Sequence, residues 1–229
     1  RAVLLTAEAR DLEASQPDKA LALATEALRL APSLIPAAEI AGRLLASKGE
    51  SRQASRLVAR TWKLAPHPDL ATVYAFAKPG ESPRDRLRRV EHLASLTPGD
   101  IEGPIAIAVA AIEARDWQRA EDAISPYLHD RPPARICALM ARIEAGEGNK
   151  GREREWLARA VRGPRDRAWI ADGYISDRWL PVSPVTGAVD AFEWKAPVDA
   201  IGRGDDSLLI EEHPFVPSPR ARETPALSS

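Results

Sequence analysis

Prolines recur at a near-constant interval in the first 164 residues, and this recurrence limits most strongly what the chain can fold into. Five of the 20 prolines are separated from one another by 34, 32, 34 and 32 residues. They stand at Pro32, Pro66, Pro98, Pro132 and Pro164. An alanine lies twelve residues before three of these prolines, at Ala20, Ala54 and Ala120. A fixed interval with the same stop and the same small residue indicates that one structural unit is repeated.

The segment from Pro17 to Pro32 shows what the unit is. It reads PDKALALATEALRLAP, with a proline suited to the first helical position and Asp18 near the positive end of the helix dipole. Its alanines and leucines form an apolar stripe, and Pro32 ends it, so a helix is predicted from Pro17 to about Leu30. The same pattern predicts nine more helices, at about 2–14, 34–47, 51–64, 70–77, 83–96, 104–114, 117–128, 134–145 and 151–161. Residues 1–164 should therefore form about five helix pairs.

The period, the small residue and the closing proline resemble the tetratricopeptide repeat family. Gly42 falls on the small-residue position of that family in the second repeat, whereas Glu8 occupies it in the first. The resemblance implies an all-α, right-handed superhelix that binds protein partners in a concave groove. By position in the repeat, the groove candidates are Glu39, Arg43, Val73, Ile105, Val109 and Glu113.

After Pro164 the helical period is lost. Residues 165–200 contain three of the six tryptophans, Trp169, Trp179 and Trp194, in short β-prone segments separated by prolines and glycines. We predict a small, partly irregular cap of strands over Trp169–Ile175, Trp179–Val182 and Phe192–Trp194, packed on the last helix pair, with the tryptophans as its core. Residues 201–229 are rich in proline and acidic residues and are expected to form an extended or disordered tail.

The cap carries a second resemblance. Its segment WLPVSPVTG, Trp179 to Gly187, continues to Trp194, and together with five degenerate repeats it resembles the C-terminal region of HemY-type proteobacterial inner-membrane proteins. That resemblance implies a non-catalytic scaffold associated with haem biosynthesis, with protein partners that include haem-pathway enzymes. It also implies a repeat domain on the cytoplasmic face of the inner membrane, tethered through an N-terminal anchor.

Composition sets further limits. The longest apolar run, Ile105 to Ile112, has eight residues, far fewer than the roughly 20 that span a bilayer. The chain starts at Arg1 already in helical periodicity, and we expect a soluble fragment whose N-terminal part is missing. The net charge is −1, with 25 basic and 22 acidic residues in 1–164 and 7 basic and 11 acidic residues in 165–229, which gives no electrostatic case for nucleic acid.

The alternative function is a haem or porphyrin carrier. Axial ligands would have to come from histidine, cysteine, methionine or tyrosine, and Cys137 and Met140 share one helix face. We interpret both as core residues and expect no cofactor and no catalytic group. The histidines His67, His92, His129 and His213 form no metal-binding motif.

The cap is also spaced like a zinc ribbon. The two knuckles would fall at Ala171/Tyr174 and Ser183/Thr186, and all four positions lack cysteine. A single cysteine in the whole chain excludes an internal disulfide and a multi-cysteine zinc site. We therefore predict that apolar packing has replaced the metal if the cap has this origin.

We interpret the segment from Pro83 to Leu96 as the one locally basic stretch of the chain. Its arginines are most simply a solvated helix face; the alternative is contact with anionic lipid or an acidic partner. They are Arg84, Arg86, Arg88 and Arg89.

Overall fold

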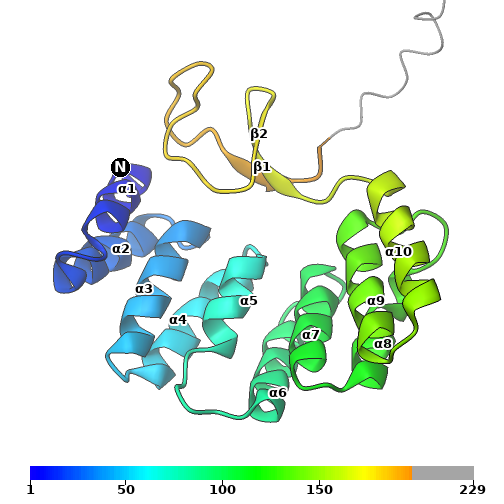
Figure 1. Cartoon of the computed structure of the whole chain (residues 1–229). Coiled ribbons are helices and arrows are strands. Elements are labelled where there is room, and N and C mark those ends of the chain that lie inside the picture. The colour runs from blue at the N-terminus through cyan, green and yellow to red at the C-terminus, as the bar shows by residue number, and fades with distance from the viewer. Residues whose placement is uncertain (198–229) are drawn as a thin grey trace, which may run out of the picture. The chain divides into compact units, whose positions relative to one another are not determined.

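The computed structural model describes residues 1–197, so the predicted tail, 201–229, and the last residues of the predicted cap lie outside the described residues. Within this range ten α-helices follow one another as five antiparallel pairs, and a three-stranded sheet follows them (Figure 1). The pairs are α1 (Ala2–Leu12) with α2 (Pro17–Leu30), α3 (Ile35–Ser47) with α4 (Ser51–Trp62), α5 (Pro68–Ala75) with α6 (Pro83–Ala94), α7 (Glu102–Glu113) with α8 (Trp117–Ile124), and α9 (Ala134–Gly146) with α10 (Lys150–Arg162). The predicted tetratricopeptide-like superhelix is confirmed.

Small residues let neighbouring helices approach closely. The three alanines that precede the repeated prolines, Ala20, Ala54 and Ala120, are all fully buried. Gly42 in α3 makes the tightest contact of this kind along the first three pairs: a Cβ there would lie 2.7 Å from Val58 Cγ2 and 2.7 Å from Val73 Cγ1. The predicted small-residue position is therefore required by packing, because any side chain would collide with α4 and α5.

Helix ends follow local signals. Pro17, Pro68 and Pro83 each occupy the first position of a helix, where a missing N–H costs nothing. The helix predicted at 117–128 ends early: α8 stops at Ile124, and Ser125–Tyr127, which contains Pro126, forms a short 3₁₀ helix. α5 has only eight residues, the length predicted at 70–77, and lies two residues earlier.

The cap contains strands β1 (Ala168–Ala171), β2 (Tyr174–Ser176) and β3 (Glu193–Lys195), antiparallel in the order β2-β1-β3. The predicted strand at Trp169–Ile175 is in fact a hairpin, because Asp172 (φ 50°) and Gly173 (φ 80°) form a two-residue turn of the kind that Asp-Gly favours. The predicted strand at Trp179–Val182 is wrong. Only an isolated bridge between Val182 and Val189 is present there.

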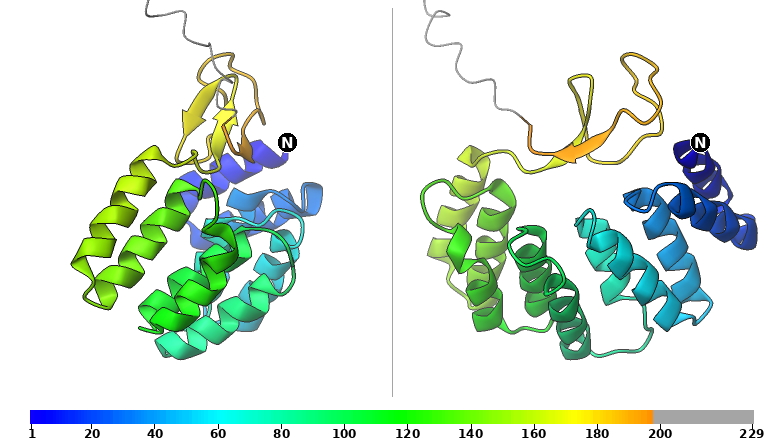
Figure 2. Two further views of the ribbon diagram at one scale, coloured as in Figure 1. Left: turned by 90° about the vertical axis from the view of Figure 1, so that its right-hand side faces the viewer. Right: turned by 180° about the vertical axis from the view of Figure 1, so that it is seen from behind.

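The cap reaches much further than the last helix pair. Views from three sides show it running along one end of the helices from α10 toward α1 (Figures 1 and 2). Arg10 of α1 donates a hydrogen bond to the Trp179 carbonyl at 3.0 Å, and its guanidinium lies 4.9 Å from the Trp179 ring centroid. Trp169 and Trp179 are 5% and 3% exposed and belong to the same hydrophobic core as the helices, so the tryptophans do not form a separate local core.

His67, the residue before α5, joins the cap to the middle of the stack. Its ring lies 4.2 Å from the Trp194 ring and 5.3 Å from the Trp169 ring, centroid to centroid. Nδ1 accepts a hydrogen bond from the Asp69 backbone N–H at 3.2 Å, which caps the helix. Burial, with a smaller effect from the Arg135 charge, lowers the pKa of His67 to about 3, so this histidine is neutral near pH 7.

Candidate functional site

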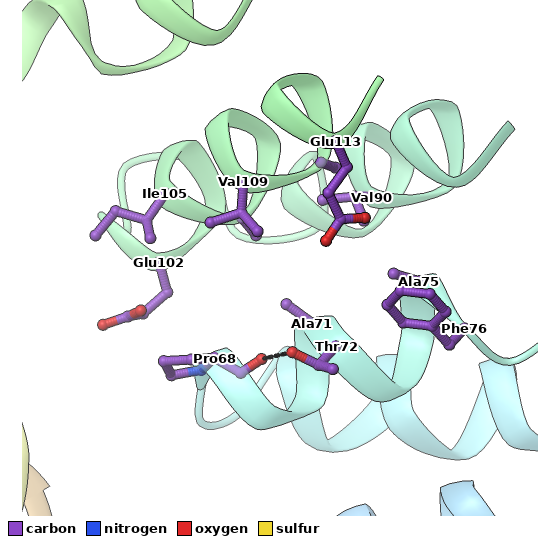
Figure 3. Close-up of a pocket in the computed structure, with 12 residues that line it drawn as sticks. Pro68, Ala71, Thr72, Ala75, Phe76, Val90, Glu102, Ile105, Val109 and Glu113 are labelled. Carbon is purple, nitrogen blue, oxygen red and sulfur yellow. Dashed lines mark hydrogen bonds between the residues drawn. The ribbon is translucent and has the colours of Figure 1, made fainter. Parts of the chain in front are cut away.

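A cleft opens between α5 and α7, the first helices of the third and fourth pairs (Figure 3). The spacing of its residues explains why they meet: on α7 the cleft residues recur every three or four positions, which places them on one helix face. The α7 side consists of Glu102, Ile105, Ala106, Val109, Ala110 and Glu113, and Pro68, Ala71, Thr72, Ala75 and Phe76 face it from α5 and the residue after it. Val90 of α6 completes the lining. We call this the α5–α7 cleft.

The cleft is narrow and mostly apolar. Its volume is about 120 Å³, and its central residues carry no charge. Alanines on both helices leave the space that larger residues would have filled. The Thr72 hydroxyl is turned back to the Pro68 carbonyl at 3.1 Å (Figure 3), so it offers its methyl group and little hydrogen-bonding capacity to the cleft.

A carboxylate lies at each end of the cleft, and the two differ in exposure and in hydrogen-bond partners. Glu102 is 1% exposed and is held by two hydrogen bonds from Arg135, at 3.0 and 2.7 Å. Glu113, at the other end, is exposed, and its nearest cationic atom, Arg86 Nε, lies 3.8 Å away. The oxygens of Glu102 are thus already occupied by Arg135, whereas Glu113 can still accept hydrogen bonds from an incoming chain.

Aromatic and basic groups border the Glu113 end. Phe76 is half exposed, and the Arg86 guanidinium lies 4.9 Å from its ring centroid. Arg86 also donates to the Glu81 carbonyl at 2.8 Å. These contacts hold Phe76 and Arg86 at the edge of the cleft.

A second pocket, of about 320 Å³, lies between α1, α3 and the cap. It has mixed charge: Glu39 bonds to Arg43, and Arg43 makes two further hydrogen bonds to Glu13, at 3.0 and 2.8 Å. Asp69 lies at the border of this pocket. Burial raises the pKa of Glu39 and of Asp69, and the nearby Arg43 charge opposes this rise.

The six predicted groove residues therefore divide between different environments. Ile105, Val109 and Glu113 line the α5–α7 cleft, while Glu39 and Arg43 line the pocket near the cap. Val73 is only 7% exposed and packs against the Gly42 position, so it is part of the core. The α5 side of the cleft was missed; its signal was the run of small residues between Pro68 and Phe76.

The four arginines of α6 do not act as one basic face. Arg89 makes two hydrogen bonds to Glu81, at 3.0 and 2.8 Å, and another to Ser55 at 3.1 Å. Arg86 is turned to Phe76 as described, and Arg88 pairs with Asp85. Of this group, Arg84 and Arg88 present the most exposed side chains, so a lipid or acidic-partner contact through all four would require existing contacts to break.

The residues considered for haem are packed in the core or lie apart. Cys137 and Met140 are 0% and 3% exposed, and burial raises the pKa of the Cys137 thiol. His92 is exposed on α6. No group of three or more His, Cys, Asp or Glu within residues 1–197 has an arrangement that could hold a metal ion.

At the positions of the hypothetical zinc knuckles, the two turns are joined by hydrogen bonds. Thr186 Oγ1 donates to Asp172 Oδ2 at 2.6 Å. Ser183 is 2% exposed, and its hydroxyl accepts from the backbone N–H groups of Val185 and Thr186. Hydrogen bonds from Ser183 and Thr186 lower the pKa of Asp172.

Comparison with known proteins places the chain near one curated protein. No family model matches the sequence. The chain is 29% identical over 231 residues to the probable magnetosome protein Mms48 of Magnetospirillum gryphiswaldense. The match covers 99% of this chain and 50% of the relative, so the chain spans about half the length of that protein.

Similar solved structures are tetratricopeptide repeat proteins and MamA. A repeat protein from Parabacteroides merdae is 18% identical, with 71% of this chain and 65% of that chain covered and a TM-score of 0.44. YrrB, described as having an unusual peptide-binding site, is 18% identical over 71% and 86% of the two chains, with a TM-score of 0.38. A MamA protein is 12% identical over 70% and 91%, with a TM-score of 0.39. The fold assignment rests on the helix pairs described above.

No helix within residues 1–197 is both long and apolar enough to cross a bilayer.

Proposed function

We propose that the chain is a non-catalytic protein-interaction scaffold whose α5–α7 cleft receives one large apolar side chain from a partner. The observation that supports this most directly is an open, mostly apolar cleft between the first helices of two neighbouring pairs. Superhelices of helix pairs commonly bind partners through the surface that their first helices share. The cleft lies on that surface.

The size of the cleft favours a side chain over a free organic ligand. Pockets for small molecules usually measure about 300–1,000 Å³, and this cleft measures about 120 Å³. A leucine, methionine or phenylalanine side chain of a partner could enter the cleft, and the partner's backbone on either side of that residue would remain on the surface. Glu113, exposed at one end, is placed to accept a hydrogen bond from the N–H groups of such a chain.

Affinity selection from a library of random 12-residue peptides tests the proposal. Selected peptides should share one large apolar residue, and replacing it by alanine should weaken binding, measured by fluorescence anisotropy. In the scaffold, Thr72→Phe should fill the cleft and weaken binding at least about tenfold. Thr72 is exposed, so the change should not disturb the core.

Thr25→Phe is the matched control. Thr25 is also an exposed threonine on a helix, in α2, and lines a different surface hollow with Arg29 and Arg56. Peptide binding should survive this substitution. Selected peptides that bind wild type and Thr72→Phe equally well would exclude the cleft as their site, and a selection without enrichment would count against the interaction function itself.

A second part of the proposal concerns where in the cell the protein acts. The relative's name connects that protein to the magnetosome, and the HemY-type resemblance connects the cap to a haem-pathway scaffold at the inner membrane. We favour the magnetosome, because the similarity to Mms48 extends over 99% of the chain. The haem-pathway partners, the membrane tether and the haem-carrier alternative stay predictions.

Localisation separates the two settings. A fluorescent fusion of the full-length protein, in a source cell that forms magnetosomes, should follow the magnetosome chain. Uniform labelling of the cell envelope together with co-purification of ferrochelatase would favour the haem-pathway setting instead.

A further inference from the structure

Exposed apolar side chains concentrate in one short part of the cap. Of the eleven large hydrophobic residues that are exposed within residues 1–197, five lie between positions 174 and 189. They are Tyr174, Ile175, Val182, Val185 and Val189, with exposed fractions of 39–61%. Isolated exposed apolar residues need no explanation, but a group of this density on one small element marks an interaction surface.

These residues belong to two loops that the structure fixes side by side. The hydrogen bond between Thr186 and Asp172 joins the two turns, at 2.6 Å, and the bridge between Val182 and Val189 closes the second loop. Both loops project away from the helices (Figure 1). We call residues 172–190 the ribbon tip. It contains three aspartates and one arginine, Arg178, so this apolar surface carries net negative charge.

The last helix of the stack shows the opposite charge. α10 has no buried residue, and on it Leu157 is 47% and Val161 87% exposed. The helix contains five basic and two acidic residues. In a superhelix each pair normally packs on the next, but here the chain turns at Gly163 and continues into β1 instead. The outer side of α10 therefore lacks the helix pair that would cover it within residues 1–197.

We propose that the ribbon tip of one copy docks on α10 of a second copy. Both surfaces expose apolar side chains that docking would bury. The ribbon tip is negatively charged and α10 is positively charged, so the two surfaces attract each other. Like net charges disfavour the pairing of two α10 surfaces or of two ribbon tips. The proposed contact is head-to-tail, so that repeated docking builds a ring or an open filament.

Sedimentation velocity of the 229-residue chain at increasing concentration tests this. Wild type should form species larger than a dimer, and the association should weaken as salt is raised. Two double variants remove exposed apolar side chains without burying new groups: Leu157→Gln with Val161→Gln on α10, and Val185→Ser with Val189→Ser on the ribbon tip. Each should raise the dissociation constant at least about tenfold and leave the circular dichroism spectrum unchanged.

Mixing the two double variants is the decisive measurement. Each has one intact surface, and the intact surfaces are complementary, so the mixture should form a one-to-one complex that grows no further. Arg84→Glu with Arg88→Glu on α6 reverses basic charge away from both proposed surfaces and should leave association unchanged. A wild-type chain that stays monomeric at 100 μM in low salt would overturn the proposal, as would association that persists in both double variants or a mixture that fails to pair.

Discussion

The two sides of α5 differ although they belong to the same eight-residue helix. Toward α3 the contact is closed: Val73 fills the space left by Gly42, and a Cβ at that glycine would lie only 2.7 Å from it. Toward α7 the contact is open, and Ala71, Thr72 and Ala75 border the α5–α7 cleft. A repeat protein can thus leave a cleft between two of its repeats while the neighbouring contact between repeats is tight.

The largest loss of stability should follow from removing Glu102, the buried carboxylate at one end of the α5–α7 cleft. Glu102→Ala leaves Arg135 without its principal partner, and breaking a buried ion pair typically costs about 3 to 5 kcal/mol. Because Arg135 retains Asp166, we expect the lower part of this range in urea unfolding. Glu113→Ala, at the exposed end, should change the free energy of unfolding by less than about 1 kcal/mol. Equal effects would mean that the two ends of the cleft do not differ as described.

A smaller effect should come from adding one methyl group on the closed side. Gly42→Ala should lower the free energy of unfolding by about 1 to 3 kcal/mol, because Val58 and Val73 are stiff and cannot move away freely. Gly151→Ala, in α10, has no atom within 4 Å of the new Cβ and should be neutral or stabilising by up to about 1 kcal/mol. If Gly42→Ala were as well tolerated as Gly151→Ala, the α3–α5 contact would not be closed.

The last effect is absent at neutral pH and develops only as pH falls; it concerns His67 at the start of α5. The pKa of His67 is lowered to about 3 from 6.5, so the unfolded chain binds a proton at this site before the folded chain does. The stabilising contribution is complete above pH 6.5 and is lost progressively as pH falls toward 3. The loss approaches about 1.4 kcal/mol per pH unit.

His67→Asn tests this assignment, since asparagine can still cap the helix. The difference in unfolding free energy between wild type and variant should shrink as pH falls from 6.5 to 5. A difference that is constant over this range would show that His67 does not titrate as described.

The sequence predicted much of the stack because its signals are local. Proline spacing and apolar periodicity located all ten helices to within about three residues at most ends, and the position of Gly42 in the repeat anticipated a close helix contact. The groove prediction found the α7 side of the cleft, Ile105, Val109 and Glu113. It failed to separate Val73 from the cleft because a helix pattern does not show which neighbour will lie against each face.

These local signals could not predict contacts between residues that lie far apart in the sequence. The hydrogen bond between Arg10 and Trp179 joins residues 169 positions apart, and no periodicity in either segment indicates it. The Asp172-Gly173 turn was available in the sequence but was read as part of a strand. The basic character of α10 was likewise overlooked in favour of α6, where Arg86 and Arg89 are already engaged by Glu81, Phe76 and Ser55.

The contact between Arg10 and the cap also changes how the stack should unfold. In a repeat protein with only neighbour contacts, terminal repeats can fray one at a time, and stability is nearly a sum over repeats. Here α1 is held by residues from the far end of the described chain, so fraying of the first pair requires the cap to detach. Residues 1–197 should therefore lose structure in a single cooperative transition and fold more slowly than an uncapped stack of the same helices, because closing a loop of this length must precede the final contacts.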